Sequence, residues 1–83
     1  MIFRFHPGKN VDSVHLAGSF NNWDMKGLPM EGPDKSGFYL IEKTLTRGNY
    51  EYKFVVNGKD WVADPTNLRT SGPTGNSLLL LGE

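Results

Sequence analysis

The chain has 83 residues, with nine basic residues balanced by nine acidic ones, and it contains no cysteine. A chain of this length forms one domain that buries only about 60 to 65% of the surface of its unfolded form, so the core is small. The balanced charge argues against nucleic acid or an anionic membrane as the main partner, and the lack of cysteine excludes disulfides and thiolate metal sites.

Neither a signal peptide nor a membrane-spanning run is apparent, since the most apolar stretch, residues 78–81, has only the length of a strand. We therefore expect a cytoplasmic protein in which residues 1–83 form a single domain. A reduced cytosol also suits a chain without cysteine.

The first two predicted strands, residues 2–6 and 11–20, alternate between apolar and polar positions, as half-buried strands do. Gly18 interrupts the second and marks a bulge or a close approach of another backbone. The side chains expected in the core from these strands are Phe3, Phe5, Val14 and Leu16.

The rest of the chain continues this pattern of short strands and turns. Residues 21–35 are rich in Gly, Pro, Asn and Asp and predict a long loop, and residues 38–45 predict a strand whose core-facing side stays open. Residues 66–75 read as irregular, and residues 78–81 as a last strand, buried on both faces or covering one end of the core. No helix is expected. The pattern predicts an all-β fold, an immunoglobulin-like antiparallel β-sandwich.

The strongest strand pattern, residues 50–56, runs into an Asn-Gly turn at residues 57–58. A two-residue loop would bury Trp61 and aim Lys59 at the core. A three-residue loop ending at Lys59 shifts the pairing by one, so that Val62 faces inward and Trp61 outward. The second register is favoured because it buries a valine where the first buries a lysine.

Catalytic or metal chemistry finds little support in these residues. His6 and His15 lie on different predicted strands and are expected at the surface or an edge, and Asp60 and Asp64 are turn residues in the simplest interpretation. Neither glycine-containing turn has the form of a phosphate-binding loop. We expect no catalytic residue, no metal ligand and no cofactor.

What is left is a set of aromatic and neutral polar residues on loops and on one outer face. Such a mixture suits a sugar, whose apolar ring face stacks on an indole while its hydroxyls form hydrogen bonds. Each residue also has a structural interpretation: a tryptophan is more often core, Trp23 could cap one end of the sandwich, and Lys53 could be a solvated strand lysine. The set comprises Asn21, Asn22, Trp23, Lys53, Trp61, Thr74, Asn76 and Ser77.

Three motifs carry a family resemblance: Gly-Ser-Phe-Asn-Asn-Trp at 18–23, Tyr-Glu-Tyr-Lys-Phe-Val-Val-Asn-Gly at 50–58, and Trp-Val-Ala-Asp-Pro at 61–65. In this order the chain resembles the glycogen-binding domain of the AMP-activated protein kinase beta subunit and the related starch-binding modules of carbohydrate-binding module family 48. The resemblance implies an immunoglobulin-like sandwich that binds α-1,4-linked glucan (glycogen, starch or malto-oligosaccharides) without catalysing a reaction. The alternative is an inert spacer or a protein-docking module beside other domains or subunits of a parent protein.

Carried over by position, the resemblance makes Trp23 and Trp61 the stacking residues, Lys53 and Asn76 the hydrogen-bonding residues, and Thr74 a loop contact. The chain departs from the family twice. It has one more residue between the lysine and the second tryptophan, and its loop before the asparagine is shorter, with Gly-Pro at residues 72–73 where the family carries a sugar-contacting leucine. Leu68 lies near that loop and is not assigned the leucine's role.

Overall fold

The computed structural model describes residues 1–72 and 75–81. Its elements are β1 (Ile2–Phe5), β2 (Val14–Gly18), a single 3-10 turn η1 (Ser19–Asn21), β3 (Tyr39–Glu42), β4 (Gly48–Val56), β5 (Asp60–Val62), β6 (Thr70–Ser71) and β7 (Asn76–Leu81). The fold is an antiparallel sandwich of two sheets, which confirms the predicted all-β class.

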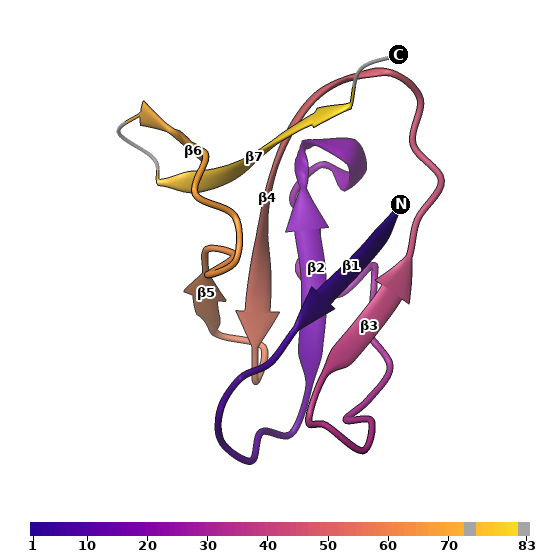
Figure 1. The fold of residues 1–83 in the computed structure, drawn as a ribbon, viewed down its shortest axis with the longest axis vertical. Coiled ribbons are helices and arrows are strands. Elements are labelled where there is room, and N and C mark those ends of the chain that lie inside the picture. Colours follow the sequence, from indigo (N-terminus) through magenta and orange to yellow (C-terminus); the bar gives the residue numbers. More distant parts are fainter. Residues whose placement is uncertain (73–74, 82–83) are drawn as a thin grey trace.

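The larger sheet is built around the long strand β4, and the smaller sheet pairs β1 with β3 across one of its faces (Figure 1). β2 lies along one edge of β4, whereas β5 and β7 share the other edge, β5 beside residues 54–56 and β7 beside residues 48–52. β6 adds two residues to the far side of β7. β4 therefore positions most of the larger sheet.

The core lies between the two sheets and is largely aromatic. Phe5 of β1 stacks on Phe54 of β4 with ring centroids 4.7 Å apart, and Phe3 meets the edge of Tyr52 at 5.1 Å. β3 turns Tyr39 and Ile41 inward, which resolves the face that the sequence left open. The buried core residues are Phe3, Phe5, Val14, Leu16, Met30, Tyr39, Tyr52, Phe54 and Val56, and all four predicted from the first two strands are among them.

The predicted loop 21–35 does more than connect β2 to β3. Leu28 accepts a backbone hydrogen bond from Leu16 at 2.9 Å, and Met30 donates one to Val14 at 2.9 Å. One residue later Glu31 exchanges two backbone hydrogen bonds with Leu40 of β3, both 2.8 Å long. Residues 28–31 thus join the edge of the larger sheet to the smaller one, a pairing that Pro29 and the turn-rich composition concealed.

Two further expectations need correction. Residues 66–75 are not wholly irregular, because Thr70 and Ser71 form β6 against the start of β7. The last strand begins at Asn76 rather than residue 78, and it is not buried on both faces: Leu79 packs against the core, whereas Leu80 is 45% exposed. It therefore covers one end of the core, which was the second of the two alternatives.

Candidate functional site

The β4–β5 hairpin places Trp61 on the outer face of the larger sheet. Val55 pairs with Trp61 and Phe54 with Val62, the register predicted for a three-residue loop. Asn57 and Gly58 both have positive φ, 56° and 70°, and Lys59 N donates to the Val56 carbonyl at 3.1 Å. Val56 pairs with Asp60, so residues 57–59 form the three-residue loop that accommodates the additional residue noted in the comparison with the family. Trp61 is consequently 41% exposed.

Trp23 reaches the same place from the turn that follows β2. Its backbone N–H donates to the Gly18 carbonyl at 2.9 Å, and the Asn21 side chain braces the turn by accepting from Gly18 N at 3.0 Å and donating to the Asp24 carbonyl at 3.1 Å. Asn22 and Trp23 both have left-handed backbones, with φ of 58° and 57°. For an aromatic residue this conformation costs about 1 to 3 kcal/mol, and such strain concentrates at functional sites.

The two indole rings meet on the surface. Their centroids are 6.4 Å apart and their planes are inclined by 49°, so Trp23 and Trp61 form two non-parallel walls of one patch. Trp23 is half-buried and Trp61 exposed. Neither ring belongs to the core cluster, which excludes for both tryptophans the more common role of core residue.

Two small buried side chains lie on the same outer face as the indoles. Ala17 and Val55 point to the outer face, yet both are fully buried and both stand apart from the core cluster. In the register of the sheet Val55 lies between His15 and Trp61, and Ala17 lies opposite Lys53. The smaller sheet of β1 and β3 lies on the opposite face (Figure 1), so whatever shields Ala17 and Val55 lies on the outer face, where Trp61 pairs with Val55.

Lys53 and Asn76 extend the same face with polar groups. Lys53 precedes Val55 by two residues on β4, so both point outward. Asn76 precedes Ser77, which opposes the inward Tyr52, so Asn76 points outward as well. Its side-chain nitrogen donates to Glu51 Oε1 at 2.9 Å. The structure thus brings four of the five predicted contact residues to one face, and the fifth, Thr74, lies outside the described residues.

His15 lies at an edge of the larger sheet, as expected, but it is less exposed than a surface histidine. It lies on β2, whose free edge pairs with Pro29 through an isolated bridge at His15, and the residue is half-buried. Its Nδ1 is a buried atom that makes no hydrogen bond to the described part of the chain. His15 is therefore part of the packing of the outer face beside Val55.

The two carboxylates near Trp61 occupy different structural positions. Asp64 accepts hydrogen bonds from the Tyr52 hydroxyl at 2.7 Å and from both the N–H and the hydroxyl of Thr66 at 2.9 and 2.7 Å. These bonds confirm its turn role and tie β4 to the segment after β5. Burial, aided by the nearby Asp64 charge, raises the pKa of the Tyr52 phenol. Asp60 is not a turn residue, since it is the exposed first residue of β5.

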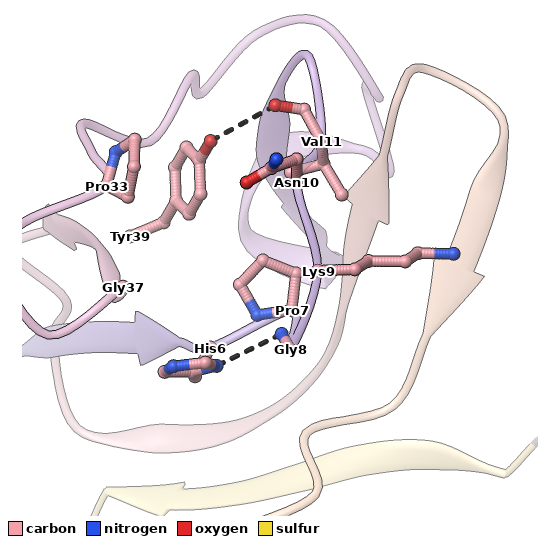
Figure 2. Close-up of a pocket in the computed structure, with 9 residues that line it drawn as sticks. All are labelled: His6, Pro7, Gly8, Lys9, Asn10, Val11, Pro33, Gly37 and Tyr39. Carbon is pink, nitrogen blue, oxygen red and sulfur yellow. Dashed lines mark hydrogen bonds between the residues drawn. The ribbon is translucent and has the colours of Figure 1, made fainter.

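A separate pocket of about 430 Å³ lies away from the tryptophans, between the β1–β2 connection and the start of β3 (Figure 2). Two of its polar groups have partners within the protein: His6 Nδ1 accepts from Gly8 N at 3.0 Å, and the Tyr39 hydroxyl donates to the Val11 carbonyl at 3.5 Å. Over residues 1–72 and 75–81, no group of three metal-ligating side chains is present. Within the same ranges no helix has the length and apolar character needed to cross a bilayer.

The outward direction of three more residues follows from the alternation of the sequence, but the burial of Ala17 and Val55 and the hydrogen bond of Glu51 to Asn76 were not predicted. Ala17, Val55 and Glu51 all occupy outward positions in the alternation, but their roles depend on the strands and loops beside them. A signal was nevertheless present, because an outward valine and an outward alanine between two tryptophan-bearing segments indicate that something large covers them.

A β-sandwich that carries a pair of surface indoles amid amide and ammonium groups is the architecture of a carbohydrate-recognition module. A family model described as the glycogen recognition site of AMP-activated protein kinase matches residues 2–81, and the chain belongs to this family. Its class is therefore that of glycogen-recognition domains, and the aromatic pair fits glucan binding.

Curated relatives agree. The beta-1 subunit of 5'-AMP-activated protein kinase from Sus scrofa is 35% identical over 65 residues, covering 78% of this chain and 48% of the relative. Protein PTST homolog 2, chloroplastic, from Arabidopsis thaliana is 33% identical over 73 residues, which cover 87% of this chain and 13% of the relative. The 1,4-alpha-glucan branching enzyme GlgB of Aquifex aeolicus is 38% identical over 73 residues, which cover 82% of this chain and 11% of the relative. The chain thus spans less than half the length of each of these relatives.

Proposed function

We propose that residues 1–83 form one carbohydrate-binding domain that holds α-1,4-linked glucan, as glycogen, starch or malto-oligosaccharide, on the outer face of the larger sheet. The observation that supports this most directly is the pair of indoles, 6.4 Å apart and inclined by 49°, outside the core. Two inclined apolar walls suit a curved chain of glucose units better than a flat one.

Each contact has a separate task. The indoles of Trp23 and Trp61 stack against the C–H faces of glucose rings, and the Lys53 ammonium donates hydrogen bonds to hydroxyl oxygens. Asn76 supplies an amide at the far side of the patch, and Thr74 an additional hydroxyl. A shallow stacking site of this size predicts a binding free energy of about −4 to −8 kcal/mol, or a Kd from millimolar to micromolar.

The test is calorimetric titration of the domain with maltoheptaose. We expect saturable binding that weakens about tenfold or more in Trp61→Ala and in Trp23→Ala, because each loses a stacking surface. Leu80→Ala is the matched control, since Leu80 is similarly exposed, at 45% against 41% for Trp61, but pairs with Asn49 near the opposite end of β4 from Val55, the partner of Trp61. Parental affinity in both tryptophan variants, with circular dichroism unchanged, would refute the proposed site.

We further propose that the domain acts without catalysis, in the cytoplasm, and beside other domains or subunits of a larger protein. The structural role of Asp64 supports the first of these points, and the partial coverage of the relatives supports the last. Incubation of the purified domain with starch is expected to release no reducing sugar. If maltoheptaose gave no binding heat and no change in tryptophan fluorescence, the alternative role, an inert spacer or protein-docking module, would be favoured instead.

A further inference from the structure

Glu51 lies on the outer face beside the proposed glucan contacts, although it is not one of them. It lies on β4 between the inward residues Tyr50 and Tyr52, so its side chain belongs to the outer face with Lys53. Its carboxylate oxygen Oε1 accepts a hydrogen bond of 2.9 Å from Nδ2 of Asn76, and the pair is partly buried. A strand carboxylate is thus used to hold the side chain of a proposed contact residue.

The chemistry of this bond fixes the orientation of the amide. An ionised carboxylate only accepts hydrogen bonds, whereas an asparagine amide has a donor end and an acceptor end. Turning the Asn76 amide around would place its oxygen against Glu51 Oε1, with two acceptors facing each other and no proton between them. The nitrogen must therefore face Glu51, and the amide oxygen is directed away from the carboxylate.

The backbone of the same residue contacts the turn that carries Trp23. Glu51 N–H donates to Ser19 Oγ at 3.1 Å, and Ser19 opens η1. The Glu51 carbonyl lies so close to Gly18 that a Cβ added there would be 2.5 Å from its oxygen. Position 51 therefore touches both halves of the site: its backbone meets the base of the Trp23 turn, and its side chain meets Asn76.

We infer that Glu51 is a positioning residue of the glucan site, which acts by holding the Asn76 amide in one orientation rather than by touching the sugar. The inference rests on the proposed function, because it assigns the task through which Asn76 contributes to glucan binding. Holding the amide in advance reduces the conformational entropy lost when the ligand binds.

The test is a double-mutant cycle read by maltoheptaose affinity. Glu51→Ala in the parent is expected to weaken binding about two- to tenfold, in line with the loss of one hydrogen bond. In the Asn76→Ala background the same substitution should have no further effect, because Glu51 acts through Asn76. Glu51→Gln should retain parental affinity, since its amide oxygen also accepts from Asn76, and it is near-isosteric and therefore retains the fold.

Glu42→Ala removes the same charge from the exposed end of β3, on the other sheet, and is the control. If Glu51→Ala lowered maltoheptaose affinity equally in the parent and in the Asn76→Ala background, the inference would be overturned. Equal losses of affinity in Glu51→Gln and Glu51→Ala would overturn it too, because they would indicate an effect of the charge. Parental affinity in Glu51→Ala would overturn it as well while leaving the proposed function intact. Only a parent that fails to bind maltoheptaose would contradict both.

Discussion

The two faces of the larger sheet use the same strands for opposite purposes. On the inner face β4 presents Tyr52 and Phe54, which fill the space between the sheets. On the outer face the same strand presents Lys53 and Val55, and the large rings there come from neighbouring segments, Trp61 from β5 and Trp23 from the turn after β2. The large side chains of the inner face are therefore buried between the sheets, whereas those of the outer face lie at the surface.

The difference shows how a small domain separates stability from recognition. The inner rings are fully covered, so their burial stabilises the fold. The outer rings share their face with the small buried side chains of Ala17 and Val55, and they keep part of their surface in solvent, where a sugar can reach it. Substitutions on the two faces should therefore have separable effects on unfolding and on binding.

The largest expected effect comes from the inner face. Phe54→Ala removes a fully buried ring that stacks on Phe5, and it should lower the free energy of unfolding by about 3 to 5 kcal/mol. A domain of this size has little stability beyond that amount, so thermal unfolding by circular dichroism should show a largely unfolded variant. A cooperative transition near that of the parent would contradict the assignment of Phe54 to the core.

A smaller effect is expected from the hydrogen bonds of Tyr52. Tyr52→Phe removes the bond to Asp64 and the one from Asn67, and should cost about 1 to 3 kcal/mol at neutral pH, measured by urea unfolding.

The same residue predicts a pH dependence. Burial raises the pKa of Tyr52 above its ordinary value of 10.0, so above that pH the unfolded chain loses a proton that the folded chain keeps. Stability should therefore fall as pH rises above 10, by about 1.4 kcal/mol per pH unit from this group. The alkaline loss should shrink in Tyr52→Phe, and an unchanged slope would show that other tyrosines cause it.

Beneath the outer rings, Val55→Ala tests the support of the patch. Removal of two buried methyl groups should lower the free energy of unfolding by about 1 to 2 kcal/mol. It should also make the position of the Trp61 ring less well defined, because Val55 pairs with Trp61. Unlike an inner substitution of equal cost, it should weaken maltoheptaose binding at a temperature where the variant is fully folded. Val56→Ala is the matched control, because the neighbouring valine faces the core. Equal affinities in the two variants would show that the rings do not depend on Val55.

The smallest effect is expected at Leu80, which is exposed on β7. Leu80→Ser should change the free energy of unfolding by less than about 0.5 kcal/mol and leave glucan affinity unchanged. A larger loss of stability or of binding would show that the outer surface of β7 contributes more than its exposure indicates.

Sequence patterns were enough to predict a succession of short strands along the chain, the inward residues of β1, β2 and β4, and the hairpin register that exposes Trp61. These features follow from local rules: the period of two, the Asn-Gly turn, and the higher cost of burying a lysine than a valine. The five proposed contacts belong to the aromatic and polar set recognised from side-chain chemistry, and the family resemblance selected them from that set; their binding roles stay predictions.

The remaining features arise only in the folded chain, because they depend on segments far apart in the sequence. The 6.4 Å between Trp23 and Trp61 requires β2 and β5 to flank β4, and no local pattern encodes that distance. The pairing of residues 28–31 with two strands and the bond from Asn76 to Glu51 likewise form only when distant backbones are already in register. Local periodicity fixes which way a side chain points, but only the assembled sheet fixes what it meets.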